Sequence, residues 1–231
     1  MMRPMRRLAT AAVAALVPVL AFANGVAVVA HPWFVRFEYA PGGVPPDELG
    51  MSDGERTRLA LVGLRAVQPW QRTGLADLER ALLADGEQAF GPREIRHMQE
   101  VRDRISVLLA IDAVSLPVLL GLALRRRSRR LVTRGLRTGA YSTLALGAVV
   151  GATLAADPIG FLTAFHEAVF FSGSSWRFDD SDTLRRLYPD RFWQETSVIL
   201  GTGAALQATA LVALTGGLPR RRTIPACRTG S

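Results

Sequence analysis

The sequence predicts a mainly α-helical membrane protein, a polytopic four-helix transmembrane bundle with a small extracytoplasmic α+β domain. Four apolar runs are each long enough to cross a bilayer, which takes roughly 20 helical residues. The chain contains no Lys, and Arg gathers in short flanks of these runs at 1–7, 125–137 and 220–228. Two further stretches, 31–104 and 157–195, mix acids with Arg and aromatic residues, which is typical of domains outside the lipid.

The first apolar run, 8–30, follows three Arg residues and forms with them the N-terminal segment 1–30. Such a run can also be a cleaved signal peptide, and Ala21-Phe22-Ala23 resembles a cleavage site. The run continues through Val29, beyond the apolar length of an ordinary signal peptide. We therefore expect a retained transmembrane helix.

Three more apolar runs cover residues 105–124, 139–156 and 196–218, and basic segments follow two of them, as a loop at 125–138 and a tail at 219–231. Positively charged flanks stay on the cytoplasmic side of a membrane. We therefore expect a multi-pass protein of the cell (plasma) membrane, with both termini and the Arg-rich loop in the cytoplasm. The net charge of +8 lies in these flanks, so nucleic acid is not an expected partner.

Small residues are frequent in the third and fourth runs, and they include Gly147, Gly151, Gly201 and Gly203. Small side chains let helix backbones approach closely within lipid. We expect close helix packing at these glycines; the alternative is that they only reflect a Gly- and Ala-rich composition.

The extracytoplasmic segment 31–104 has signals for both strand and helix. Aromatic and apolar residues alternate with others over 33–39, which favours a short strand. Ser52–Glu55 is a capping-box pattern that begins a helix, and another short helix is expected at about 74–84. Pro92 suits the first position of a helix that runs unbroken into the second span.

All three histidines, His31, His97 and His166, lie in the predicted outer segments. His97 precedes the second span by eight residues on one helix, a rise of about 12 Å that places it at the membrane surface. Glu100 and Arg104 share its helical face by their spacing. His166 lies on a helix that Asp157-Pro158 begins and that ends before Gly173, Ser174 and Ser175.

Familiar catalytic motifs are missing from the sequence. His166-Glu167 begins like H-E-x-x-H but lacks the second His, and no G-x-S-x-G, phosphate-binding or dinucleotide-binding motif occurs. Cys227, the one cysteine, lies in the basic tail, so neither a disulfide within the chain nor a Cys-rich metal site is expected. Histidines without an evident nucleophile suit a reaction in which the substrate brings its own, because His is the usual general base near neutral pH. Hydrogen-bonded surface histidines are the alternative.

Four stretches together resemble a bacterial integral-membrane family, the one that includes the lipoprotein intramolecular transacylase (Lit). Its R-E-x-x-H-M-x-D-V-K pattern resembles Arg93–Arg102, and its F-H-E-x-F-F, W-x-x-D and P-x-x-F-[FW] patterns resemble the region 165–193. The other two stretches are Glu38-Tyr39 with Val44–Asp47 and Gly50, and Glu55-Arg56. Glu100 and Arg102 depart from the pattern, which usually has Asp and Lys there.

The resemblance implies an enzyme that moves an acyl chain from the diacylglyceryl group of a lipoprotein onto the amine of its N-terminal Cys. Its partners are then membrane lipid and the diacylglyceryl-modified lipoprotein, with no cofactor and no metal. The catalytic residues that it implies are His97 and His166, which we expect to converge with room for an ester and an amine between them. Residues expected to bind substrate are Glu100, Arg102, Glu167, Trp176, Asp179 and Tyr188.

Two other functions remain open from the sequence. One is a non-enzymatic membrane scaffold or accessory protein, in which both histidines are replaceable. The other is a metal-dependent membrane hydrolase, because histidines and carboxylates can bind a metal, although no ligand spacing supports it.

Overall fold

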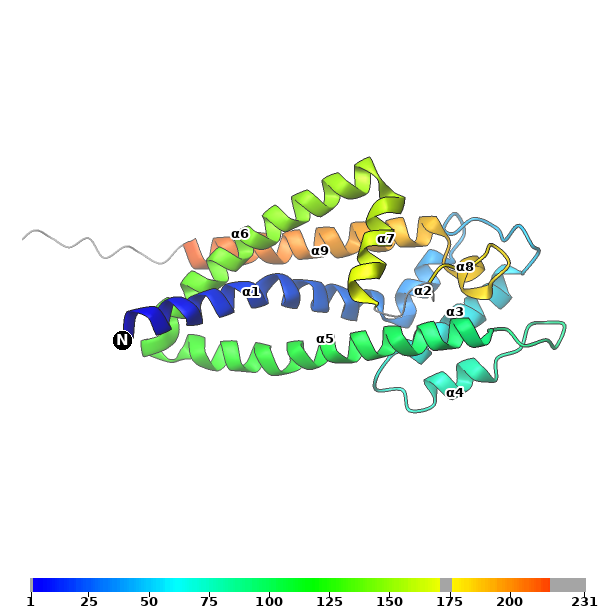
Figure 1. Cartoon of the computed structure of the whole chain (residues 1–231), viewed down its shortest axis with the longest axis horizontal. Coiled ribbons are helices and arrows are strands. Elements are labelled where there is room, and N and C mark those ends of the chain that lie inside the picture. The colour runs from blue at the N-terminus through cyan, green and yellow to red at the C-terminus, as the bar shows by residue number, and fades with distance from the viewer. Residues whose placement is uncertain (1, 171–175, 217–231) are drawn as a thin grey trace, which may run out of the picture.

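The computed structural model describes residues 2–170 and 176–216, and this part of the chain is mainly helical (Figure 1). In chain order the helices are α1 (Met2–Val29), α2 (Pro32–Glu38), α3 (Asp53–Val67), α4 (Gly74–Glu79), α5 (Pro92–Leu124), α6 (Arg126–Ala156), α7 (Pro158–Val169), α8 (Thr183–Leu187) and α9 (Asp190–Gly216). In the described ranges 4 helices, α1, α5, α6 and α9, are long and apolar enough to cross a membrane. The prediction of a mainly helical protein with these four helices is confirmed.

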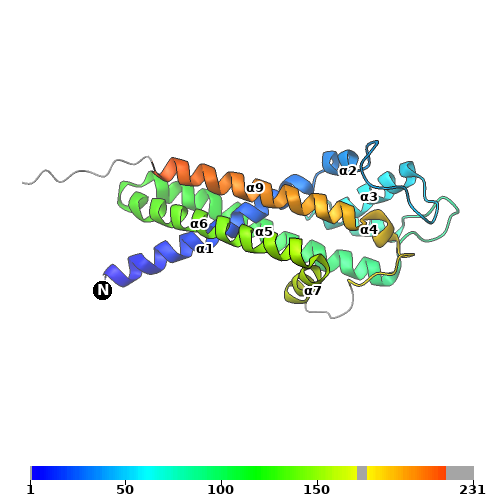
Figure 2. The same cartoon turned by 90° about the horizontal axis from the view of Figure 1, so that it is seen from above.

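The four long helices lie lengthwise beside one another in an elongated bundle (Figures 1 and 2). α1 contacts α5, α6 and α9, so the first apolar run forms a shared neighbour of the other three helices. α2, α3, α4 and α8 lie at one end of the bundle, which we call the domain end. The start of α1, the junction of α5 with α6 and the end of α9 lie at the opposite end, which we call the basic end.

Glycines let α6 approach α1 closely. A Cβ added at Gly135 would lie 2.6 Å from the Val13 side chain, and one at Gly139 would lie 2.5 Å from the carbonyl oxygen of Ala14. Both distances are too short for a real contact, so the close approach depends on the missing side chains. The positions predicted for this role are wrong, because an added Cβ meets no described atom within 4 Å at Gly147, Gly151, Gly201 or Gly203.

A polar contact joins α1 to α9 inside the apolar bundle. The Asn24 amide donates to Oε1 of Gln207 over 3.1 Å, and Nε2 of Gln207 donates to the carbonyl of Ala21 over 3.3 Å. Side-chain amides that bond across helices satisfy each other where water is scarce. The pair therefore fixes the register of the two helices.

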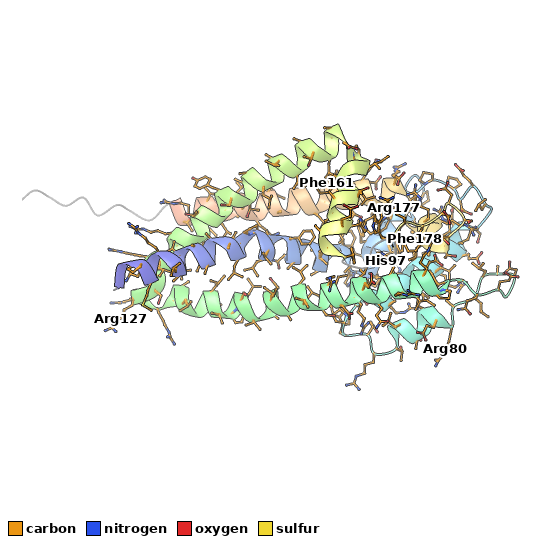
Figure 3. All side chains as sticks on the ribbon, in the orientation of Figure 1. Arg80, His97, Arg127, Phe161, Arg177 and Phe178 are labelled. Atoms are coloured by element: carbon orange, nitrogen blue, oxygen red, sulfur yellow. The ribbon has the colours of Figure 1, made fainter. Side chains whose placement is uncertain are left out.

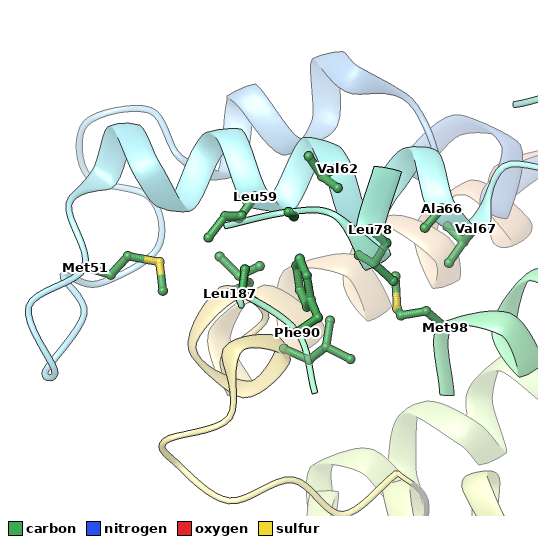
Figure 4. Packing of buried hydrophobic residues seen from close by; sticks show 12 residues of the cluster. Met51, Leu59, Val62, Ala66, Val67, Leu78, Phe90, Met98 and Leu187 are labelled. Carbon is green, nitrogen blue, oxygen red and sulfur yellow. The ribbon is translucent and has the colours of Figure 1, made fainter. Parts of the chain in front are cut away.

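The domain end has its own apolar core between α3, α4, α8 and the start of α5 (Figure 4). Its largest fully buried side chains are Leu59, Leu78, Phe90 and Leu187. Met98 of α5 packs into the same core. This core fixes the first turns of α5 against the small domain.

Buried polar groups hold the loop between α2 and α3. Arg56 is 2% exposed and donates to the carbonyls of Pro45, over 2.6 Å, and Arg186, over 2.9 Å. Asp47 forms an ion pair with Arg186 at 2.7 Å. Buried charges need such partners, so the loop is tied to both α3 and α8.

The strand predicted at 33–39 is wrong, and with it the α+β domain. This segment forms α2, with Pro32 in its first turn and the His31 side chain accepting a hydrogen bond from the backbone N–H of Trp33 at 3.3 Å. Phe34, Val35 and Glu38 are its buried residues, a helical spacing. Residues 2–170 and 176–216 contain no named strand and only an isolated bridge between Leu82 and Gln88.

Several helix boundaries follow the sequence signals. α5 runs unbroken from Pro92, and Glu94 accepts from the N–H of Gly91 at 2.7 Å, which bonds the backbone just before the helix to its first turn. Ser52 caps α3 as predicted. α7 begins at Pro158, with Asp157 accepting from the N–H of Gly160.

Other boundaries differ from the prediction. Residues 126–138, expected as part of a basic loop, are helical and form the first turns of α6, because Arg is a good helix former. α9 begins at Asp190 rather than at 196, and the helix expected over 74–84 ends at Glu79. The break expected at 173–175 and the basic tail lie outside the described residues.

Candidate active site

His97 lies on α5 at the domain end, before the apolar stretch 105–124 (Figure 3). Its side chain is buried, and its ring centroid lies 5.3 Å from that of Phe170 and 5.4 Å from that of Phe178. The buried Nδ1 atom has no hydrogen-bond partner among the described residues.

His166 lies on α7 and is half-buried. Its Nδ1 atom is 2.8 Å from the carbonyl oxygen of Leu162, one turn earlier. A carbonyl only accepts hydrogen bonds, so Nδ1 carries the hydrogen. In the neutral ring, Nε2 then has a free lone pair, which is the state that a general base needs.

The two imidazoles converge from distant parts of the chain. Their ring centroids are 6.3 Å apart and their planes differ by 26°. The prediction that they converge is confirmed, whereas the fit of an ester and an amine between them stays a prediction. Phe170 lies 5.4 Å from His166 and contacts both rings.

Burial keeps both histidines neutral. Desolvation and the nearby His166 lower the pKa of His97 to about 4, against an opposing effect of Glu100. Burial also lowers the pKa of His166, although the hydrogen bond to Leu162 opposes the shift. At neutral pH each ring can therefore accept or donate a proton as a neutral imidazole.

The other predicted site residues are divided between two places. Trp176 stacks on His166 with centroids 4.3 Å apart, and Glu100 acts electrostatically on His97. Glu167 is exposed on α7 beside His166. These side chains lie on or beside the histidine pair.

Arg102 and Tyr188 have backbone partners instead. The Arg102 guanidinium donates to four backbone carbonyls at 2.7–3.1 Å, that of Ala66 in the last turn of α3 and those of Gln68, Pro69 and Gln71 in the segment that follows it. The Tyr188 hydroxyl donates to the carbonyl of Ala60 over 3.0 Å. Asp179 is exposed and lies 3.6 Å from Arg93. The donors that a substrate was expected to use are therefore bonded within the fold.

Two further features of the site come from the structure. Phe178 packs edge-on against His97, with ring centroids 5.4 Å apart, and the Arg93 guanidinium lies 5.4 Å from the centroid of the Phe178 ring. Arg104 donates from Nε to the carbonyl of Val169, the last residue of α7, over 3.0 Å. The i+7 spacing from His97 pointed to Arg104 as a neighbour, but a bond to a backbone carbonyl leaves no sequence signal.

The described residues contain no group of three or more His, Cys, Asp and Glu side chains arranged to hold a metal ion. The metal-dependent hydrolase hypothesis thus has no ligand set in residues 2–170 and 176–216.

Comparison with known families identifies the chain. The family model described as lipoprotein intramolecular transacylase Lit matches residues 11–193, most of the sequence. The protein belongs to the Lit family. The matched region contains both His97 and His166, and Lit-family membership together with the four apolar helices makes this a membrane protein.

Relatives of this Lit-family chain are distant. An uncharacterized protein of Aquifex aeolicus (strain VF5) is 28% identical over 197 residues, which cover 85% of this chain and 88% of that protein. The solved structure of the membrane integral lipoprotein intramolecular transacylase Lit from Bacillus cereus has a TM-score of 0.69 at 18% identity, covering 91% of this chain and 94% of that one. A structure of the same protein with one histidine replaced by arginine has a TM-score of 0.64 at 18% identity, covering 92% and 91%. These structures establish that the Lit fold is shared.

Proposed function

We propose that this protein is a lipoprotein acyltransferase. It moves an acyl chain from the diacylglyceryl group of a lipoprotein to the α-amine of that lipoprotein's N-terminal Cys. The observation that carries the proposal is the pair of neutral, facing imidazoles, His97 and His166, in a Lit-family membrane protein. The substrate supplies both the acyl ester and the nucleophile, so the site needs only proton transfer and charge stabilisation.

The reaction balances without a cofactor. The amine attacks the ester carbonyl, a C–N bond forms, and the C–O bond to the glyceryl oxygen breaks. Nε2 of His166 accepts the amine proton and then gives it to the departing oxygen, leaving an amide and a free hydroxyl. An α-amine has an ordinary pKa of about 7.7–8.0, so holding it against the ester is the larger task.

His97 stabilises the oxyanion that forms when the amine attacks. It is more deeply buried than His166 and harder to protonate, so it acts as a neutral donor rather than as a cation. A hydrogen-bond donor in a dry site stabilises developing negative charge more than the same donor in water. Trp176 stacks on His166, Glu100 acts electrostatically on His97 and Glu167 follows His166 on α7, and we expect all three to contact the substrate around its reacting groups.

The protein crosses the membrane several times, with the basic end in the cytoplasm. Arg125 and the Arg-rich start of α6 lie at the basic end, where Arg127 marks it in Figure 3. Positive flanks favour the cytoplasmic side. Segments 31–104 and 157–195, and with them the histidines, then lie at the outer face, where lipid-modified proteins are anchored.

Acyl chains reach the site along α7. This helix leaves Ile159 78% and Phe165 39% exposed, and Phe161 stacks on Phe165. Apolar side chains on a short helix beside the bundle suit the boundary between headgroups and acyl chains. Membrane lipid and the lipoprotein anchor therefore share one entrance.

The test uses purified full-length protein in detergent with a synthetic diacylglyceryl lipopeptide. Because the transfer is intramolecular, the product has the mass of the substrate, so it is identified by fragmentation and by loss of the reactive α-amine. We expect conversion by the wild type and a loss of at least about 100-fold in His166→Ala. His31→Asn is the matched control, because Asn still caps α2. A wild type that leaves the α-amine free overturns the proposal.

A further inference from the structure

The helix that carries His166 has little buried support. None of the 12 residues of α7 is buried, although α7 is tethered to α6 through Asp157. α7 crosses beside the bundle rather than lying within it (Figures 1 and 2). Something other than a packed core must set the distance between His166 on α7 and His97 on α5.

Arg104 bonds the end of α7 to α5. The last carbonyls of a helix lack donors within the helix. Here the N–H of Phe170 donates a hydrogen bond to the carbonyl of His166 at 2.7 Å, and Nε of Arg104 donates one to the carbonyl of Val169 at 3.0 Å. A guanidinium at the carboxyl end of a helix is also favoured by the helix dipole.

The hydrogen bond from Arg104 to Val169 lies directly beside the histidine pair. Val169 immediately precedes Phe170, whose ring contacts His97 at 5.3 Å and His166 at 5.4 Å. Arg104 lies seven residues after His97 on the unbroken helix α5, about two turns away. The single helix α5 therefore carries both His97 and Arg104, the residue that bonds the end of the helix carrying His166.

We propose that Arg104 is a positioning residue of the acyl-transfer site, holding α7 so that the His166 ring faces His97. The inference rests on the proposed function for its consequence in catalysis. In this role Arg104 acts through the Val169 carbonyl. Its hydrogen bond is exposed, so its loss should misplace His166 without unfolding the protein.

The kinetic test compares Arg104→Ala, Arg104→Lys and the control Arg96→Ala, which removes an exposed Arg from the same helix. We expect Arg104→Ala to lower kcat by roughly 10- to 100-fold with KM and Tm little changed, because a small misplacement of a catalytic group slows the chemical step. Lys supplies a single charged donor to the carbonyl and should restore most of the rate. The proposal is overturned if Arg104→Ala reacts as fast as the wild type. It is also overturned if the slower rate of Arg104→Ala comes with a lower Tm and Arg104→Lys does not restore the rate.

A second readout does not need activity. The chain contains only three histidines, so their NMR titrations can be assigned with His31→Asn and single replacements of the other two. Release of α7 exposes both rings, and in Arg104→Ala the midpoints of His97 and His166 should rise toward about 6.5. They should not move in Arg96→Ala. If the midpoints shift in Arg104→Ala but the wild type does not convert the lipopeptide, the positioning role is supported and the proposed function is wrong. If the wild type is active but the midpoints in Arg104→Ala do not shift, only the positioning role is wrong.

Discussion

The indole of Trp176 lies parallel to the imidazole of His166, with ring centroids 4.3 Å apart and planes inclined by 22°. Arg177 lies over the same indole at 5.2 Å, so the indole contacts both a cation and the proposed base. The stack covers one face of His166 and limits how the ring can turn about its bond to Leu162. Trp176 is thus placed to keep His166 desolvated and oriented.

Replacing Trp176 should slow the enzyme without unfolding it. A stacked aromatic pair contributes about 0.5–1.5 kcal/mol, so we expect Trp176→Ala to lower kcat/KM by up to about 10-fold and Trp176→Phe to lower it less. The measurement is the initial rate of α-amine loss from the lipopeptide. Trp70→Ala, at a 56% exposed indole, is the control. Equal rates for Trp176→Ala and the wild type would mean that the stacking of Trp176 on His166 does not contribute to catalysis.

Arg102 should matter to stability more than to substrate binding. Its guanidinium bonds four carbonyls at the end of α3 and in the segment after it, including those of Ala66 and Gln68, which Lys cannot do with one ammonium group. We expect Arg102→Ala to lower the free energy of unfolding by about 2–4 kcal/mol and Arg102→Lys by somewhat less. Thermal unfolding in detergent measures the change. A raised KM with an unchanged Tm would instead assign Arg102 to the substrate.

Features that were predicted from the sequence have a pattern of hydropathy, spacing or motif, and features that were missed have none. Hydropathy predicted the four long helices, and unbroken helical spacing after Pro92 placed His97 beside the start of the second span. Its approach to His166 depended on family motifs, because contacts between distant segments leave no periodicity. The roles of Arg102 and Arg104 were hidden, since both bond to backbone carbonyls that any residue can supply.

The α2 error has a different cause. Over Trp33–Tyr39 the residue types alternate, but the segment is short, and a helical face with Phe34 and Val35 fits it as well. Pro32, which suits the first turn of a helix, was the deciding local signal. Positive charge in 125–138 indicated a side of the membrane and was interpreted as a loop, but Arg is a good helix former and residues 126–138 are helical.

Glu38 should make the protein less stable at alkaline pH. The Glu38 residue is 1% exposed, and burial together with the nearby Glu195 raises the pKa of its carboxyl group from 4.5 to about 7. The folded pKa is above the unfolded value, so the folded state binds the proton more tightly. The resulting stability is complete below pH 4.5 and is lost as the pH rises through about 7.

The variant Glu38→Gln isolates this effect, because the amide stays neutral at every pH. The quantity to follow is the Tm of the wild type minus the Tm of Glu38→Gln. We expect this difference to fall by roughly several degrees between pH 5.5 and pH 8.5. Titrating groups that do not interact with Glu38 are common to both proteins and cancel in the difference, so the difference reports Glu38 together with its neighbour Glu195. Glu48→Gln, at an exposed acid, is the control. A Tm difference that does not vary with pH would mean that Glu38 does not carry the proton.

Gly139 should tolerate no side chain, because α6 contacts α1 there. A Cβ would lie 2.5 Å from the Ala14 carbonyl oxygen and 2.6 Å from a Val17 methyl group, and the backbone oxygen cannot move aside without shifting α1. We expect Gly139→Ala to lower the free energy of unfolding by about 1–3 kcal/mol through overpacking. Gly147→Ala on the same helix meets open space and should be neutral or slightly stabilising, because Ala favours a helix by about 1 kcal/mol over Gly. Thermal unfolding of both variants in one detergent makes the comparison. Equal Tm values would mean that α1 and α6 do not pack at Gly139, and the arrangement of the bundle around α1 would have to be revised.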